Sequence, residues 1–161
     1  MKTGADVAVL NRHGTRQPIP PGHLTKQIIY SVMPFDNHLV TMRVTGSALL
    51  ENLACCNAHV SGVTRKGGKW RLVNGKAIEP KRVYSVVTTD YSYTGGGCAW
   101  ERADPKGEAG VDWREPVLEW LVAHPTSAAN GLETVLDTRA RVEAASVKKP
   151  TETTKPECQH P

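Results

Sequence analysis

Short apolar runs alternate along the chain with polar segments rich in glycine and proline, which is typical of a domain that mixes strands and helices. Two runs rich in β-branched residues, 6–10 and 83–89, predict buried strands. Residues 38–45 alternate with period two and predict another strand. A last strand is expected around residues 138–142, where it would complete the sheet.

A hairpin is predicted around Asn74-Gly75, between residues 70–73 and 76–78. Both turn positions tolerate positive φ, so this dipeptide is a strong hairpin signal. The densest basic run spans residues 65–71 and falls where a polar connection is expected. We interpret this run as a solvated hairpin tip rather than a groove for a phosphate backbone.

Three helices are predicted from capping residues and apolar stripes. Thr25 can cap a short helix that runs through Val32 and ends before Pro34, because a residue that precedes proline disfavours helical geometry. Thr45 or Ser47 can cap a second helix, whose apolar stripe at helical spacing comprises Leu49, Leu50, Leu53, Ala54 and Cys56.

The third predicted helix follows a polar loop at residues 104–110. Asp112 can cap this helix, and Pro116 lies in its first turn, where proline is tolerated. The helix ends near Pro125, and its buried stripe comprises Val117, Leu118, Leu121 and Val122. Together these elements predict an α+β fold with a mixed sheet and about three helices.

Length predicts one domain, at residues 1–143. Residues 144–161 are rich in Lys, Thr, Glu and Pro without an apolar period, and we predict that they are disordered. The 20 basic and 16 acidic residues give a net charge of +4 but are interspersed, which argues against a nucleic acid as partner. No segment has the apolar length of a membrane span, and no secretory signal precedes Asp6.

The four cysteines are Cys55, Cys56, Cys98 and Cys158, and they have neither C-x-x-C spacing nor histidine partners of the kind found in zinc sites. Cys55 and Cys56 are adjacent in a helical pattern. One of them is expected to pack in the core, and the other to face outward or lie at the margin. No disulfide framework can be inferred from this pattern.

Two polar loops are the best candidates for a ligand site. Residues 11–16 follow the first predicted strand, and residues 91–97 follow the strand at 83–89. Strands fix the position of such loops, and glycine lets the backbone approach a ligand closely. Between the two loops lies the segment 34–37, which carries Phe35, the only phenylalanine of the chain. This distribution predicts a ligand site.

Four segments, taken together in their order and spacing, resemble a known family. They read A-D-V-A-V-L-N-R-H-G-T-R, I-Y-S-V-M-P-F-D-N, V-T-G-S-A-L-L-E-N-L and V-Y-S-V-V-T-T-D-Y-S-Y-T-G-G-G. From about Ala5 to Val142 the chain resembles the C-terminal domain of the 5'-nucleotidase and UDP-sugar hydrolase family. The resemblance implies the substrate-recognition half of a phosphoric ester hydrolase that acts on nucleotides.

In this family two aromatic residues stack on the nucleobase, and the resemblance assigns these places to Phe35 and Tyr91. A base has two apolar π faces, and stacking contributes about 1–3 kcal/mol per base. From the residues alone, the alternative is that Phe35 fills the core and Tyr91 ends a strand.

The resemblance also assigns polar contacts with the nucleoside to Asn11 and the phosphate to Arg16, whose planar guanidinium can bind two oxygens. It places Gly95 and Gly96 among the substrate-binding residues. The structural alternatives are an Asx-type turn for Asn11 and a surface ion pair for Arg16.

The chain departs from the family pattern at three positions. Arg12 and His13 stand where the pattern has glycines, and Gly97 stands where it has an aspartate that accepts hydrogen bonds from ribose hydroxyls. Loss of such an acceptor costs about 1.5–3 kcal/mol, and Asp90 should point elsewhere because it precedes Tyr91. Other anionic esters, such as cyclic nucleotides and sugar nucleotides, are therefore alternative substrates. A degenerate module that binds a partner protein is a second alternative.

The resemblance places catalysis outside this chain, in an N-terminal metallophosphoesterase domain with two divalent metal ions of the zinc or manganese type. That domain would belong to the same full-length protein or to another chain, so this chain alone is expected to be inactive. Asp36-Asn37-His38 resembles one metal-ligand motif without its partner motifs, and we interpret it as a coincidence. The family domain also has a helix before the first strand, where this chain has only residues 1–5. A periplasmic, surface-exposed or secreted location is implied.

Overall fold

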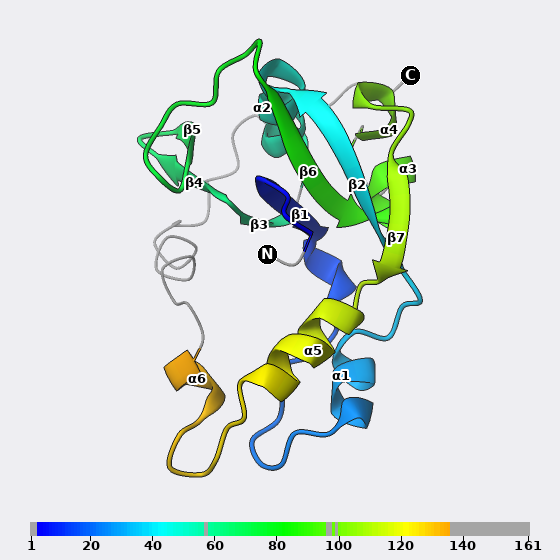
Figure 1. The fold of residues 1–161 in the computed structure, drawn as a ribbon, viewed down its shortest axis with the longest axis vertical. Coiled ribbons are helices and arrows are strands. Elements are labelled where there is room, and N and C mark those ends of the chain that lie inside the picture. Colours follow the sequence, from blue (N-terminus) through cyan, green and yellow to red (C-terminus); the bar gives the residue numbers. More distant parts are fainter. Residues whose placement is uncertain (1–2, 57, 96–97, 99, 136–161) are drawn as a thin grey trace, which may run out of the picture.

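The computed structural model describes residues 3–56, 58–95, 98 and 100–135. It has a five-stranded mixed sheet in the order β3-β1-β6-β2-β7 and a separate hairpin, β4–β5 (Figure 1). The strands are β1 Val7–Asn11, β2 His38–Thr45, β3 Ala58–Ser61, β4 Val63–Lys66, β5 Lys69–Leu72, β6 Val83–Thr89 and β7 Glu108–Asp112. The helices are α1 Lys26–Val32, α2 Gly46–Cys55, α3 Asp90–Thr94, α4 Trp100–Ala103, α5 Glu115–Ala123 and α6 Leu132–Val135, with a short 3-10 helix, η1 Arg12–Gly14.

The predicted α+β fold with a mixed sheet is confirmed, and α1, α2 and α5 are the three described α-helices of seven residues or more. The strand directions bring several loops to one edge of the sheet. β1 is parallel to β6. β2 is antiparallel to β6, with Leu39 opposite Thr89, and to β7, with His38 opposite Asp112. The carboxyl ends of β1, β6 and β7 therefore share one edge with the amino end of β2.

Two predicted helix caps are confirmed. The Thr25 hydroxyl accepts a hydrogen bond from the Ile28 N–H at 3.3 Å, at the start of α1. The Thr45 hydroxyl accepts one from the Ala48 N–H at 3.3 Å, at the start of α2. Each cap satisfies one of the N–H groups that a helix leaves without a partner in its first turn.

The sequence prediction is wrong at the far edge of the sheet. The polar loop expected at residues 104–110 instead leads into β7, which pairs with β2. Because β7 is an exposed edge strand, it lacks the apolar alternation that reveals a strand with one buried face. Asp112 does not cap α5, because its carboxylate binds Arg114, and the helix begins at Glu115.

The tight hairpin turn lies at Gly67-Gly68, where both residues have positive φ, rather than at Asn74-Gly75. The basic run at residues 65–71 thus forms a hairpin tip, as expected. Asn74-Gly75 turns the chain a second time, with φ +82° at its glycine, but a single β-bridge replaces the strand expected at 76–78. Each turn contains glycine with positive φ. The Asn-Gly dipeptide alone therefore could not show which of the two turns joins paired strands.

Two apolar clusters stabilise the fold. The larger one lies between the sheet and α2 and includes Val9, Met42, Leu49, Val86 and the fully buried Trp100. The smaller one joins α1 to α5 and comprises Ile29, Val32, Met33 and Trp113, with partly buried leucines from α5 around it. Phe35 belongs to neither cluster.

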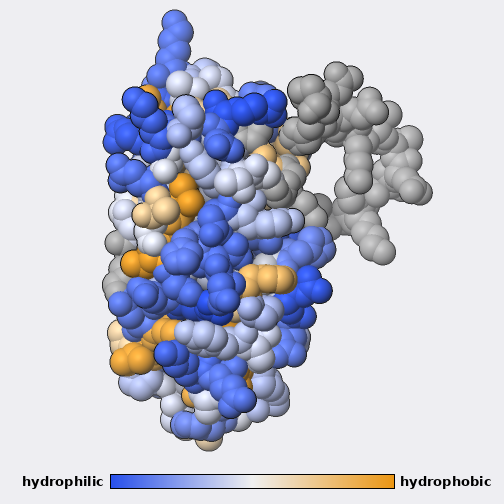
Figure 2. Space-filling view, turned by 90° about the vertical axis from the view of Figure 1, so that its right-hand side faces the viewer, coloured by the Kyte–Doolittle hydropathy of each residue, from blue (hydrophilic) through white to orange (hydrophobic). Residues whose placement is uncertain are grey.

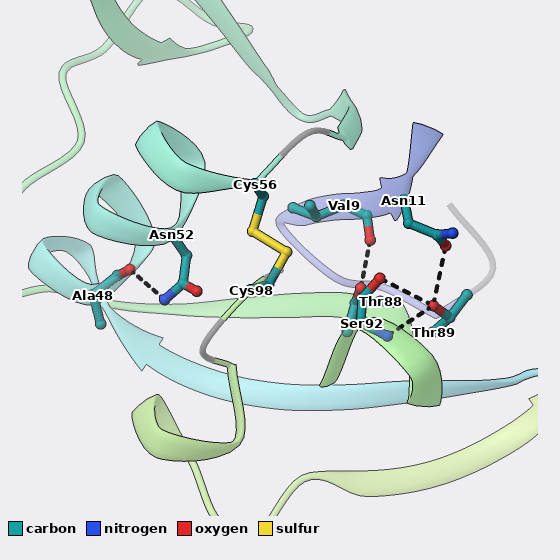
Figure 3. The surroundings of a disulfide bond; sticks show 9 residues. All are labelled: Val9, Asn11, Ala48, Asn52, Cys56, Thr88, Thr89, Ser92 and Cys98. Atoms are coloured by element: carbon teal, nitrogen blue, oxygen red, sulfur yellow. Dashed lines mark hydrogen bonds between the residues drawn. A yellow bond between two sulfur atoms is a disulfide. The ribbon is translucent and has the colours of Figure 1, made fainter. Parts of the chain in front are cut away.

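A disulfide joins Cys56, the C-cap residue directly after α2, to Cys98, between α3 and α4 (Figure 3). The two Cα atoms are 5.3 Å apart, and 42 positions separate the residues in the sequence. Cys56 packs against the larger apolar cluster, to which Cys98 belongs. The sequence pattern did not predict this pairing.

The face on the β7 side is mainly hydrophilic, with separate small apolar groups (Figure 2). Within the described ranges, no helix is long and apolar enough to cross a membrane. The strand expected at 138–142 and the tail at 144–161 lie outside the described residues.

Candidate functional site

The three segments that the sequence singles out meet at one edge of the sheet, which we call the loop edge. Residues 11–16 leave β1, residues 34–37 enter β2, and residues 90–95 leave β6. The arrowheads of β1, β6 and β7 point toward this edge in Figure 1. The β7–α5 connection, residues 113–114, also lies here, because β7 ends beside the start of β2.

The rings of Phe35 and Tyr91 do not fill the core. Phe35 is 44% exposed and Tyr91 is 56% exposed, whereas Tyr84 and Tyr93 are buried. Tyr30 is 40% exposed, but the Arg114 guanidinium lies over its ring. Tyr91 lies in the first turn of α3 rather than in a loop. Large exposed aromatic rings at the ends of neighbouring strands are available to a ligand.

Arg16 and Phe35 lie together. The Arg16 guanidinium carbon is 5.8 Å from the centroid of the Phe35 ring, at the outer limit of a cation–π contact. The Arg16 N–H donates to the Val32 carbonyl at 2.9 Å, which fixes the loop after η1 against the end of α1. Arg16 itself is exposed and forms no ion pair within the part of the chain that the structure describes.

Asn11 ends β1 and reaches across to the end of β6 (Figure 3). Its Oδ1 lies 3.5 Å from the Thr89 hydroxyl, which donates to it. Thr89 also caps α3, because its oxygen accepts from the Ser92 N–H at 3.3 Å. Asn11 is therefore connected to the helix that carries Tyr91.

The glycine pattern of the first loop has a steric explanation. Gly14 is buried, and a β-carbon there would lie 3.0 Å from a ring carbon of Trp113 and 3.1 Å from Asn11 Oδ1. Arg12 and His13 are exposed, so their side chains need no space in the packed part of the loop. The close contacts therefore favour glycine at position 14, whereas the two positions before it accommodate large side chains.

The glycine-rich segment after α3 is described only in part. Gly95 is exposed, and its carbonyl accepts a hydrogen bond from the Cys98 N–H at 2.8 Å. A β-carbon at Gly95 would contact nothing within 4 Å. Gly96 and Gly97 lie outside the described residues. The disulfide of Cys98 joins this segment to the end of α2.

Asp90 joins the Phe35 segment to α3. Its Oδ1 accepts hydrogen bonds from the Asn37 amide at 2.6 Å and from the Tyr91 N–H at 2.8 Å. Its Oδ2 accepts one from the His38 N–H at 3.1 Å. The carboxylate is thus used inside the protein, and Asn37 and His38 serve this connection. Among the described residues, no group of three or more His, Cys, Asp or Glu side chains could hold a metal ion.

Trp113 and Arg114 also build the loop edge, and sequence reasoning did not find them. The Trp113 indole N–H donates to the Phe35 carbonyl at 2.9 Å. Arg114 is 3% exposed and binds Asp112 through two nitrogens, at 2.9 and 2.7 Å, and Asp36 at 2.6 Å. These hydrogen bonds hold the pKa of the Asp112 carboxyl below its usual value and raise the pKa of Arg114. The sequence carries no local signal for this network, because an arginine looks the same whether buried or exposed.

A hollow of about 380 Å³ lies beside the loop edge, between β2, β7 and the start of α5. Its lining includes Leu39, Thr41, Val111 and Pro116, and none of the predicted site residues. The hollow is therefore separate from the place where Phe35, Arg16 and Asn11 lie.

Comparison with known proteins identifies the family of this chain. Residues 1–102 match the family of the 5'-nucleotidase, C-terminal domain. Protein UshA of Escherichia coli (strain K12) is 29% identical over 118 residues, which are 65% of this chain and 21% of UshA. The chain thus spans about a fifth of the length of this relative.

Solved structures show the same fold. Haemophilus influenzae NAD nucleotidase (NadN) superposes with a TM-score of 0.61 at 22% identity, over 75% of this chain and 27% of that one. The 5'-nucleotidase precursor from Thermus thermophilus gives a TM-score of 0.55 at 24% identity, over 70% of this chain and 26% of that one. Because the family match covers more than half of its residues, the chain belongs to the 5'-nucleotidase C-terminal domain family.

Proposed function

We propose that this domain binds the substrate of a 5'-nucleotidase-type hydrolase, with the base stacked between Phe35 and Tyr91. The observation that carries the proposal is the exposure of both rings at one edge of the sheet, with the Arg16 guanidinium beside Phe35. Asn11 would contact the nucleoside, Arg16 the phosphate, and the backbone at Gly95 and Gly96 would approach the ligand.

The chemistry of these side chains suits a nucleotide. Two aromatic rings can each stack on one face of a base, for about 1–3 kcal/mol per contact. Arg16 has no carboxylate partner among the described residues, so its guanidinium is available to two phosphate oxygens. Arg12, also exposed at this edge, adds positive charge that favours an anionic ester.

Hydrolysis itself would take place in an N-terminal metallophosphoesterase domain with two divalent metal ions, in the same full-length protein or another chain. The match to a C-terminal domain and the fifth of UshA that the chain spans support this division of labour. The chain would then lie in the periplasm, at the cell surface or outside the cell. The disulfide between Cys56 and Cys98 supports such an oxidising compartment.

Calorimetric titration with adenosine and AMP tests the proposal. Phe35→Ala and Tyr91→Ala should each weaken adenosine binding roughly 5- to 150-fold, the equivalent of one lost stacking contact. Tyr91→Phe should retain most of the affinity, because the ring remains. Arg16→Ala should weaken AMP and spare adenosine, and Arg65→Ala on the hairpin should affect neither. Unchanged adenosine affinity in both alanine variants of the aromatic residues would refute the stacking role.

The same titration separates the alternatives. Tight binding of a cyclic nucleotide or sugar nucleotide, but not AMP, would keep the class and change the substrate. If no nucleoside, nucleotide or sugar nucleotide binds, the domain is a module for another partner. As a companion assay, the chain alone with AMP and zinc or manganese should release no phosphate. Turnover that a chelator removes, and that survives repurification, would contradict the proposed division between domains.

A further inference from the structure

We infer that the β7–α5 corner, Asp112–Arg114, positions the Phe35 ring, with Trp113 and Arg114 as positioning residues that do not contact the ligand. The corner lies beyond residue 102, where the match to the family ends. The inference rests on the proposed role of Phe35 in binding, but the effect of the corner on the position of the Phe35 ring can be tested without a ligand.

The segment that carries Phe35 has no helix or strand of its own between α1 and β2. Its conformation therefore depends on the groups that contact it from elsewhere. Trp113 supplies two of these contacts, with its indole N–H on the Phe35 carbonyl at 2.9 Å and its backbone N–H on the Asn37 carbonyl at 3.1 Å. The backbone is thus held on both sides of Asp36.

Arg114 holds the same segment from a buried position. Its Nη2 donates to the Asp36 carboxylate at 2.6 Å, and its Nη1 donates to the Met33 carbonyl at 3.3 Å. Asp112 binds the guanidinium through two further hydrogen bonds, and the Tyr30 ring lies 4.3 Å from the guanidinium carbon. A buried arginine with four of its five donors bonded has one favoured orientation, because any other would leave the buried charge without these partners.

The corner also connects Phe35 to the other two segments of the site. The Trp113 ring packs on Gly14, in the loop that leads to Arg16. On the other side, Asn37 donates to Asp90, whose carboxylate also accepts the Tyr91 N–H. The segments that carry Phe35, Tyr91 and Arg16 are therefore joined before any ligand binds. Preorganisation of this kind raises affinity, because less ordering is required on binding.

The single phenylalanine makes the ligand-free test direct. Protein labelled with 4-fluorophenylalanine has one 19F resonance, from position 35. Asp36→Ala removes the salt bridge from an aspartate that is 91% exposed, and Arg114 keeps its bonds to Asp112, so the fold should survive. In Asp36→Ala the 19F resonance should move toward that of the free amino acid or broaden. Glu108→Ala, which removes an exposed carboxylate elsewhere on β7, should leave the resonance unchanged. An unchanged resonance in both Asp36→Ala and Arg114→Lys would overturn the inference.

The binding arm uses neutral adenosine, so that the change in protein charge has little effect. Asp36→Ala should weaken adenosine roughly 3- to 10-fold at an unchanged melting temperature, and should have no further effect in a Phe35→Ala background. If Phe35→Ala weakens binding but Asp36→Ala and Arg114→Lys bind as the wild type does, the positioning role fails. If Phe35→Ala has no effect, the proposed function fails instead, and the 19F resonance still decides whether the corner holds Phe35.

Discussion

The loop edge and the β4–β5 hairpin differ in the burial and pairing of their charged side chains. At the loop edge, Arg114 is 3% exposed and bound by two carboxylates. On the hairpin, Lys66 and Lys69 lie opposite each other at the exposed tip, with no acidic partner in the described part of the chain. A buried ion pair fixes the relative positions of its side chains, whereas exposed charges of one sign mainly keep the surface hydrated.

The positive net charge of the chain is concentrated on the hairpin and the turn after it. Residues 63–82 contain seven basic residues and one acidic residue, a net charge of +6. Since the whole chain has a net charge of +4, the remaining residues sum to −2. The mild basicity of the sequence therefore comes from the hairpin and the turn after it. It carries no information about the loop edge, where Arg114 is paired with Asp36 and Asp112.

The largest effect is expected from the covalent connection near the loop edge. The double variant Cys56→Ser/Cys98→Ser should lose about 4 kcal/mol of unfolding free energy, because the disulfide closes a loop of 42 positions in the unfolded chain. Urea unfolding of the variant and of the wild type measures the difference. A loss below about 1 kcal/mol would show that this crosslink contributes little to the stability of the site.

Arg114→Met should cost about 3 kcal/mol, because it leaves the partly buried Asp112 carboxylate without its partner. Lys69→Met makes a similar change on the hairpin and should stay within about 0.5 kcal/mol of the wild type. Both values come from the same urea titrations. Equal losses in the two variants would contradict the distinction between the two regions.

Acid should weaken the loop edge through Asp112. Its pKa is lowered mainly by the hydrogen bonds from Arg114, so the ionised carboxylate stabilises the folded state. This contribution is complete above the ordinary aspartate pKa of about 3.9 and is lost as pH falls through the lowered value. The stability difference between wild type and Asp112→Asn should be constant from pH 7 to about 5 and should narrow toward pH 2. A constant difference down to pH 2 would disprove the linkage.

The smallest effect is expected at the hairpin tip. Lys66→Gln removes a like-charge pair across the two strands and should stabilise the protein by roughly 0.2–0.5 kcal/mol at low salt. Because salt screens exposed charges, the gain should disappear near 1 M sodium chloride. Thermal unfolding at both salt concentrations measures it. A clear loss of stability would mean that Lys66 has a partner that the hairpin geometry does not suggest.

The sequence by itself determined the strands and helix caps that depend on residues close together in the chain. The strands at 38–45 and 83–89 have the predicted bounds, and Thr25 and Thr45 cap their helices as predicted. Such signals depend on periodicity and on hydrogen bonds three residues apart, so a single stretch of chain contains them. The four motifs, taken together in their order and spacing, were sufficient to identify the family.

Contacts between distant parts of the chain decided the rest. β7 is a strand only because the edge of β2 pairs with it, and its exposed residues show no alternation. The contact between Arg114 and Asp36 joins residues 78 positions apart, and no spacing rule relates them. The sequence thus predicted which side chains form a ligand site, but tertiary packing decided the contacts of Trp113 and Arg114 with the Phe35 segment, since burial and pairing are properties of the folded chain.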